Sequence, residues 1–512
     1  MDTRVNENIG LLEEVRPTAK QKITMWRSIT SEPILFLYSI VYMVNLTILP
    51  QLVLHKVLLQ NENGGGVNNS TSLVNVTTTM VPTGNVKHSP EIKKLASDWW
   101  YAVLASAQIP AIFTVLIWGP ISDAIGRKKA MIVIPIVSIL QNIIFVLCSH
   151  FMSSHVIFLC IGMLLACLFG ELPGVIALSC SFIADVTRGK KSETRIARMA
   201  FVEFSINLAG IPAGLFGGHL LKSMGFVSVF CLSICVNILL LLYIIFILPD
   251  PTKLNNNVED QYKENKSYSM ENGSKSNQQQ HPELSTTTDS PASKSPIDWD
   301  LFKPHKQIQK VFKLVTSKER RSYVLPALAN FLCVIYAFTG ELSITALFLK
   351  GEPLNFGANY IGYYFANQAV IRSIGVVATT QIAYHVVKAT EMSTIMFCTC
   401  SQIVCFVLIG ASNTTLFVFL VNIAGFATPG PMSVLRSYIS KQVPQDKVGT
   451  VLAACASIEA TSYTLNLITL QIYNHTLEWF HGTAFMFLAF MSFLGLCIST
   501  AIRFTSKNHD KE

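Results

Sequence analysis

The stretch Gly119-Pro-Ile-Ser-Asp123-Ala-Ile-Gly126-Arg127-Lys128-Lys129 lies in the short gap between two long apolar segments, 99–121 and 130–149. Glycines permit a tight turn and a close approach of helices, and Asp123 is near an expected helix end, where a carboxylate can interact with a helix dipole or an arginine. A loop that only set the orientation of a membrane protein needs a few positive charges, but not this whole pattern. The stretch therefore predicts a structured turn between two membrane helices.

The composition of the whole chain is that of a membrane protein. Of its 512 residues, 51% are hydrophobic and only 14% are charged, and the mean hydropathy is +0.43. Segments long enough to cross a bilayer recur twelve times along the chain. They cover residues 33–55, 99–121, 130–149, 156–184, 199–221, 226–248, 323–349, 360–384, 391–411, 415–436, 449–472 and 482–503. The sequence thus predicts an all-α membrane protein with twelve transmembrane helices.

A long polar break after the sixth segment divides the twelve segments into two groups of six. We expect an N-terminal six-helix bundle over 33–248 and a C-terminal six-helix bundle over 323–503. The segment 249–322 between them is rich in Asn, Gln, Ser and Lys and is typical of a disordered linker. The tails 1–32 and 504–512 complete this plan.

Positive charges predict how the chain is oriented. With the N-terminus inside, the short outer loops carry only Lys222 and Lys350. The short inner loops carry Arg127, Lys128, Lys129, Arg188, Lys190, Lys191, Arg195, Arg198, Lys388, Lys441 and Lys447. This bias places both tails and the linker in the cytosol. The net charge of +8 is then charge at the inner leaflet, and we expect no nucleic-acid partner. Residues 1–32 contain no apolar run, so we expect no cleavable signal peptide.

The outer loop at 56–97 is rich in Asn, Thr, Ser and Gly, and it contains sequons at Asn68, Asn69 and Asn75. Because this loop is expected on the lumenal side, we predict glycosylation at one or more of them. None of the twelve cysteines lies in this loop, so we expect no lumenal disulfide framework. The closely spaced cysteines have no nearby histidine and are expected to be packing residues. The sequence predicts no metal site and no cofactor.

Ionisable residues inside the apolar segments are the candidates for function. A charge at bilayer depth is costly without partners or water, so it usually marks an ion or substrate path. A buried carboxyl group can bind and release a proton near neutral pH. The residues are Glu171, Glu203, Glu341, Arg372, Arg436 and Glu459.

We expect Glu203 and Glu171 to carry the proton, since no basic residue shares the apolar segment of Glu203. Arg436 and Arg372 are expected to attract substrate carboxylates or phosphates, with Glu341 beside them. The alternative for Arg372 is a fixed ion pair with Glu459 or Glu341 that only holds the C-terminal bundle together.

Glycine and proline predict breaks in two of the segments, at 168–174 and at 425–431. Broken helices leave backbone groups unpaired, which is tolerable beside a cavity. The alternative is a simple kink caused by packing. Arg436 follows the second break by about two turns and is expected to face the cytosolic mouth.

The stretch from Gly119 to Lys129 resembles the loop between helices 2 and 3 of major facilitator superfamily transporters. This resemblance implies a fold of two six-helix bundles. It also implies that Asp123, Gly126 and Arg127 form a gate that holds the inner face shut in one state.

A narrower resemblance is to the proton-coupled folate transporter and thymic stromal cotransporter family. It rests on Phe182-Ile-Ala184-Asp185-Val-Thr187, Arg195-Ile-Ala-Arg198-Met199-Ala-Phe-Val-Glu203 and Gly217-Gly218-His219. It implies that Glu203 is the proton-coupling glutamate, that Glu171 replaces an aspartate, and that Arg436 is the arginine of the tenth helix. One departure is Phe338, which stands near the position of a histidine in the seventh helix of the folate carrier.

These observations predict a proton-coupled secondary transporter that moves a small, folate-like organic anion into the cytosol. Cyclic dinucleotides and muropeptides are alternative substrates within the same family. The first rival class is a membrane receptor without transport. A membrane enzyme is excluded, because no spaced His/Asp set or Ser/His pair lies at one membrane face.

The N-terminal stretch Glu7-Asn-Ile-Gly-Leu11-Leu12 resembles an acidic dileucine signal that binds a sorting adaptor. A disordered tail without a signal is the alternative. We therefore expect the protein in the plasma membrane or in the endosome/lysosome membrane.

Overall fold

The computed structural model describes residues 31–64, 90–187, 192–249, 321–444, 447–476 and 479–509, together with the single positions 306, 309 and 313. The sequons at Asn68, Asn69 and Asn75 lie outside the described residues, as does most of the expected linker. The sorting signal with Glu7, Leu11 and Leu12 also lies outside them. These features remain predictions.

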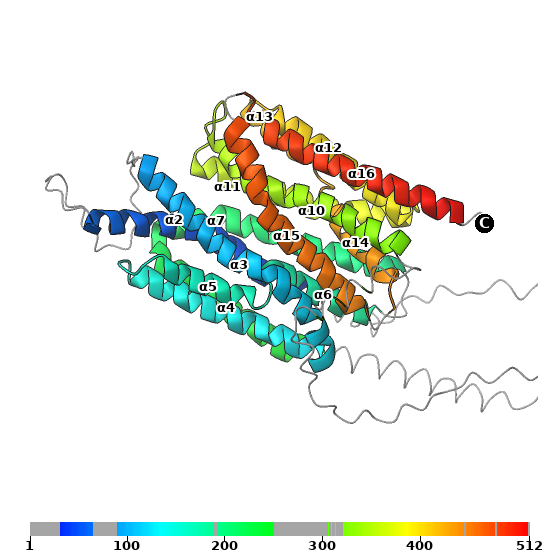
Figure 1. The fold of residues 1–512 in the computed structure, drawn as a ribbon, viewed down its shortest axis with the longest axis horizontal. Helices are drawn as coiled ribbons and strands as arrows, with labels where there is room; N and C mark the ends of the chain where they lie inside the picture. Colours follow the sequence, from blue (N-terminus) through cyan, green and yellow to red (C-terminus); the bar gives the residue numbers. More distant parts are fainter. Residues whose placement is uncertain are drawn as a thin grey trace, which may run out of the picture.

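The described chain is all-helical, and Figure 1 shows its helices in two groups. The N-terminal half contains α2 (Glu32–Gly64), α3 (Pro90–Ile125), α4 (Arg127–His150), α5 (Ile157–Cys167), α6 (Glu171–Val186), α7 (Ser192–Leu242) and the π-helical turn η1 (Tyr243–Ile247). The C-terminal half contains α10 (Arg321–Lys350), α11 (Ala358–Gln381), the π-helical turn η3 (Ile382–Val386), α12 (Glu391–Gly410), α13 (Thr415–Ala424), α14 (Gly430–Lys441), α15 (Val448–Thr476) and α16 (Thr483–His509).

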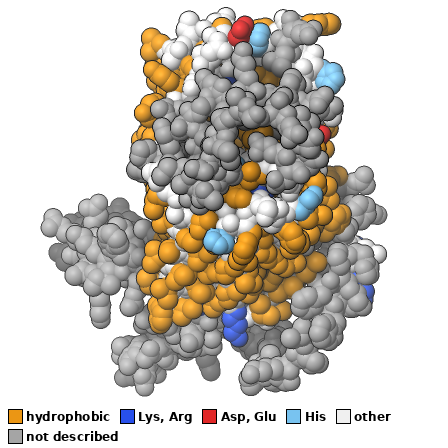
Figure 2. All heavy atoms as spheres, turned by 90° about the vertical axis from the view of Figure 1, so that its left-hand side faces the viewer, with side chains coloured by type: hydrophobic (Ala, Val, Ile, Leu, Met, Phe, Trp, Pro, Cys, Tyr) orange, Lys and Arg blue, Asp and Glu red, His pale blue; other side chains and the backbone are white. Residues whose placement is uncertain are grey.

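Within the described residues, ten helices are long and apolar enough to cross a membrane. Two of the twelve expected transmembrane segments are not among these ten helices. Segment 360–384 corresponds to α11 and η3, which carry Asn, Gln and Arg side chains, and segment 415–436 is divided between α13 and α14. Seen from the end of the molecule, the flanks of the described surface are largely hydrophobic, as expected for helices that face lipid (Figure 2). The predicted all-α membrane fold is confirmed.

Several helices extend beyond the apolar segments that predicted them. α2 continues to Gly64 and α3 already begins at Pro90, so both enter the expected outer loop 56–97. Hydropathy marks where a helix leaves an apolar environment, whereas its backbone hydrogen bonds continue into the polar residues beyond. Segments 199–221 and 226–248 are two helices that share the label α7 and meet at Gly225, whose φ of 75° and ψ of 174° are not helical. Glycine is almost the only residue that adopts this conformation.

The two halves share a buried apolar core at the expected cytosolic end. One buried apolar cluster draws on both halves, with Ile34, Ile183, Met199, Phe331, Leu435 and Leu452 among its members. Toward the opposite end each half has its own cluster, although Ala460 of α15 joins the N-terminal one. The structure is therefore closed at its expected cytosolic end.

Small residues let the two halves approach closely. α3 runs beside α15 (Figure 1), and a Cβ atom on Gly119 would stand 2.9 Å from the Cβ of Ala453 and 3.0 Å from the carbonyl oxygen of Gly449. α7 meets α11 in the same way, because a Cβ atom on Gly214 would stand 3.3 Å from the carbonyl oxygen of Gly362. Such small-residue contacts are typical of membrane helix pairs.

Candidate functional site

The break between α5 and α6 places Glu171. Gly170 precedes it in the left-handed conformation, with φ 75°, and a Cβ atom there would stand 1.9 Å from Cγ2 of Val115 on α3. Only glycine fits this position, both for its backbone angle and for its space. The predicted break at 168–174 is confirmed.

Neighbouring helices donate hydrogen bonds to carbonyl groups at the two breaks. Thr114 of α3 donates a hydrogen bond to the carbonyl of Cys167, at 2.5 Å. Ser401 of α12 donates to the carbonyl of Ala424 at the end of α13, at 2.6 Å. The second predicted break is also confirmed, since α14 does not begin until Gly430. In both halves the polar backbone of the break is paired inside the protein.

A small, partly open cavity lies in the N-terminal half beside Glu171. Its polar and aromatic lining comprises Tyr38, Tyr42, Asn45, Trp100, Gln108, Ser138, Gln141 and Glu171. Oδ1 of Asn45 is buried without a hydrogen-bond partner among the described residues. None of the described residues that line the cavity is basic. The cavity therefore presents aromatic and hydrogen-bonding side chains, but among its described lining residues it offers no cation of its own.

Arg436 of α14 binds two glutamates at once. One terminal guanidinium nitrogen contacts Glu203 of α7, and the other lies 2.6 Å from Oε2 of Glu459 of α15. The guanidinium also lies 5.3 Å from the ring centroid of Phe331 on α10. All three charged side chains are buried, with 3% of Arg436 and 4% of each glutamate exposed. We call Glu203, Arg436 and Glu459 the triad.

The triad changes two expectations. Arg436 does not face the cytosolic mouth, because α14 directs it into the contact between α7 and α15, where it is 3% exposed. Glu203 has a basic partner after all, but from the other half of the molecule. A contact between residues so far apart in sequence is set by how the halves pack, which the pattern of one segment does not contain.

The second buried pair joins Arg372 of α11 to Glu341 of α10. The guanidinium lies 2.7 and 2.8 Å from the two carboxylate oxygens, and Gln368 donates to the same carboxylate at 2.9 Å. Of the two partners that the sequence left open for Arg372, the structure selects Glu341. Both residues belong to the C-terminal half, and their opposite charges balance.

The residues expected to form a gate also lie together. Arg127 contacts Asp123, and its Nε lies 2.9 Å from Oδ2 of Asp185. Gly126, with φ 96°, makes the turn between α3 and α4. Gly449 of α15 packs against this group, and a Cβ atom there would stand 2.7 Å from Oδ2 of Asp123. The cluster thus lies where the two halves meet at the expected cytosolic end.

Two tyrosines that the sequence pattern did not single out interact both with Glu171 and with members of the triad. Tyr42 lines the cavity and interacts electrostatically with Glu171 and Glu459. Tyr463 of α15 interacts in the same way with Glu171 and with all three members of the triad. The only signal in the sequence is that Tyr463 follows Glu459 by four residues, which places both on one helix face.

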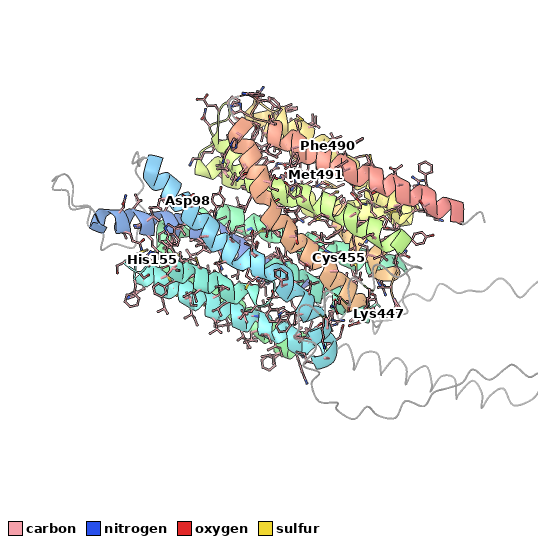
Figure 3. All side chains as sticks on the ribbon, viewed as in Figure 1. Asp98, His155, Lys447, Cys455, Phe490 and Met491 are labelled. Atoms are coloured by element: carbon pink, nitrogen blue, oxygen red, sulfur yellow. The ribbon has the colours of Figure 1, made fainter. Side chains whose placement is uncertain are left out.

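Figure 3 shows the level of this site in the molecule. Asp98 and His155 mark one end and Lys447 marks the expected cytosolic end, while Cys455, one turn before Glu459 on α15, lies between them. Within the described residues no group of three or more His, Cys, Asp and Glu side chains is placed to hold a metal ion.

Comparisons with known proteins agree with this architecture. The sequence profile of the Major Facilitator Superfamily matches residues 34–465, so the chain belongs to that superfamily. The solved structure of the human organic anion transporter MFSD10 (TETRAN) superposes with a TM-score of 0.64 at 14% identity, covering 92% of this chain and 97% of that one. This likeness concerns the fold alone.

Relatives with curated functions belong to a narrower group. The lysosomal proton-coupled steroid conjugate and bile acid symporter SLC46A3 of Gallus gallus is 24% identical over 481 residues, which cover 93% of this chain and 94% of that protein. The proton-coupled folate transporter of Rattus norvegicus is 23% identical over 433 residues, covering 80% of each. The expected relationship to the folate transporter family is confirmed, and the protein is a transporter rather than an enzyme.

Proposed function

We propose that this protein is a proton-coupled symporter that carries an organic anion into the cytosol. The observation that carries the proposal is a buried arginine, Arg436, held by carboxylates from both halves of a major facilitator fold. Two relatives are named as proton-coupled carriers, one of steroid conjugates and bile acids and the other of folate.

The geometry supports an exchange of partners at Arg436, in which the substrate anion replaces a glutamate that has taken up a proton. A carboxyl group that accepts a proton loses its charge and therefore most of its attraction to the guanidinium. The freed edge of the guanidinium then binds the anionic group of the substrate. Since Glu203 belongs to the other half, its protonation also removes a link between the halves. Proton and anion thus enter the site together.

We assign the body of the substrate to the aromatic and polar side chains that line the small cavity beside Glu171. Tyr42, which lines this cavity, and Tyr463 each interact electrostatically with Glu171 and with members of the triad, so a molecule of moderate length is expected to reach both the cavity and the triad. Rings of the substrate pack against aromatic side chains such as Trp100, while Asn45 supplies an amide for hydrogen bonding. Glu171, which faces this cavity, is our candidate for a site that passes the proton to the triad.

We place the anion at Arg436 and not at Arg372. Both carboxylate oxygens of Glu341 are already held by Arg372 within one half of the protein. This balanced pair is better suited to fixing α10 against α11 than to exchanging partners during transport. We also propose a gate formed by Asp123, Gly126 and Arg127. It keeps the cytosolic end closed until proton and anion are bound and the two halves change their arrangement.

The arrangement favours a substrate with one anionic group. Arg436 is the only base of the triad, and none of the described cavity residues adds another. Steroid conjugates and bile acids with one anionic group satisfy this condition, whereas one of the two carboxylates of folate finds no basic partner. Folate is therefore our second candidate. An acidic compartment such as the lysosome supplies the required gradient, and Leu11 and Leu12 are the candidate sorting signal toward it.

The test is uptake by the purified full chain in lipid vesicles. Labelled taurocholate, estrone sulfate and folate are offered from an acidic exterior to a neutral interior. We expect accumulation of taurocholate or estrone sulfate above the outside concentration, and its loss when a proton ionophore collapses the gradient. Vesicles that accumulate none of the three probes contradict the proposed function.

A further inference from the structure

The triad contains one base and two acids. Arg436 contributes one positive charge, whereas Glu203 and Glu459 contribute two negative charges if both are ionised. The titratable groups that face it are Tyr42 of α2, Cys180 of α6, and Cys455 and Tyr463 of α15. None of these groups is a base. Among the described residues, the second carboxylate therefore has no cation to balance it.

A buried charge without a counter-charge is costly, and more so at bilayer depth. Two carboxyl groups that contact the same guanidinium are coupled, so their protons belong to the pair and not to one residue. The cheapest way to remove the excess charge is a proton on either glutamate. The remaining carboxylate then balances Arg436.

We propose that Glu203 and Glu459 share one proton in the empty site, and that the second glutamate takes up a proton when a substrate anion binds Arg436. This inference rests on the proposed function and adds Glu459 as a coupling residue equivalent to Glu203. The empty site holds one proton and one carboxylate beside the arginine. The loaded site holds two protons and the substrate anion beside the same arginine.

The triad with its bound protons and substrate is neutral in both states. This determines the net charge that crosses the membrane in one transport cycle. Each transport cycle carries one proton with each monoanion, so the translocated pair has no net charge. The site is matched to monoanionic substrates, because a second negative charge on the substrate brings back the imbalance that the shared proton removes.

The first experiment uses the unmodified protein in vesicles and taurocholate, a monoanion, as the probe. A potassium gradient with valinomycin sets the membrane potential while the pH gradient is held constant. We expect the accumulation ratio of taurocholate to be independent of the potential. An accumulation ratio that follows the potential overturns the inference. Since this experiment needs no variant, it does not depend on whether altered triads fold.

The second experiment compares Glu203→Gln, Glu459→Gln and the double variant. In either single variant one carboxyl group remains to balance Arg436 when the site is empty and to accept the proton when the anion binds. Both are therefore expected to accumulate taurocholate. The double variant has no carboxyl group to titrate, so it should exchange labelled for unlabelled taurocholate but lose accumulation completely. Glu391→Gln is the matched control, because it removes a carboxylate paired with a base, Lys441, outside the triad.

The outcomes separate this inference from the proposed function. Loss of accumulation in Glu203→Gln or Glu459→Gln alone, with exchange intact, shows that one glutamate is the sole coupling residue and overturns the sharing. Accumulation by the double variant overturns it as well. Failure of the unmodified protein to accumulate taurocholate along the pH gradient counts against the proposed transport of bile acids, on which the inference rests.

Discussion

Arg436 shows how one residue can serve three purposes. Its guanidinium reaches Glu203 of one half and Glu459 of the other, while its face lies over the ring of Phe331. Arginine can do this because its planar group carries several donors in fixed directions. Lysine has the same charge but concentrates it at one point.

Arg436→Lys should therefore weaken substrate binding without removing the positive charge. We expect the half-saturation concentration for taurocholate exchange to rise about tenfold, which corresponds to a loss of about 1.4 kcal/mol. Arg503→Lys, at an exposed position near the end of α16, is the control and should leave the concentration unchanged. A normal half-saturation concentration in Arg436→Lys removes this residue from the binding site.

The pair of Arg372 and Glu341 is expected to act on stability. Glu341→Leu leaves a buried guanidinium without its counter-charge, which should cost about 3–5 kcal/mol of the free energy of unfolding. Replacing both residues, as Glu341→Leu with Arg372→Met, removes the charges together and should recover most of this loss. Thermal unfolding in detergent measures both variants. Equal stability of the single variant and the unmodified protein contradicts the assignment.

At the scale of elements, the two broken helices are the features that position the site. A continuous helix through 168–170 would have turned Glu171 to another face, because each residue advances the helix by 100°. The break depends on Gly170 in its left-handed conformation and on its close contact with Val115. Hydroxyl groups from α3 and α12 donate to carbonyl groups at the two breaks.

Gly170→Ala should destabilise the protein. The new methyl group meets Val115 at 1.9 Å, and the backbone angle is unfavourable for alanine, so we expect a loss above about 1 kcal/mol in thermal unfolding. The matched control is Gly357→Ala before α11. A Cβ atom there meets nothing within 4 Å, and φ is −71°. If both variants unfold at the same temperature, the break does not depend on glycine.

At the scale of the whole molecule, the two halves share a buried core at the expected cytosolic end, whereas toward the other end each half has a core of its own. The shared apolar cluster and the contact of Gly449 with Asp123 both lie at the closed end. Transport requires the opposite arrangement as well, in which α15 moves away from α3. The structure thus represents one of two states between which the halves must alternate.

Gly449→Ala should shift the balance toward the state that is open to the cytosol. The added methyl group stands 2.7 Å from Oδ2 of Asp123, so it pushes α15 from the end of α3. Cys455 of α15 is fully buried in the closed arrangement and should then be labelled faster by a thiol reagent added from the cytosolic side.

The internal control is Cys398 of α12, which is buried against Gly430 within the C-terminal half. Its labelling rate, followed by mass spectrometry of the same sample, should not change. Equal rates for Cys455 in the variant and the unmodified protein contradict a role of Gly449 in closure.

The sequence by itself determined the membrane class, the helical segments and the two breaks. These properties follow from local patterns, since an apolar run of sufficient length must pair its backbone within a helix, and glycine or proline interrupts it. Hydropathy predicted helix ends less well, as the extended α2 and α3 show. The sequence also selected Glu171, Glu203 and Arg436 as candidates, because charge is expensive inside a membrane.

Only the tertiary structure decided which charges meet. The sequence left Arg372 with two possible partners and gave Glu203 none, whereas the packing of α7, α14 and α15 brings Arg436 between Glu203 and Glu459. The physical reason is that an ion pair is set by distances between side chains on different helices. Those distances depend on how two separate halves approach each other, and no segment of the chain carries that information alone.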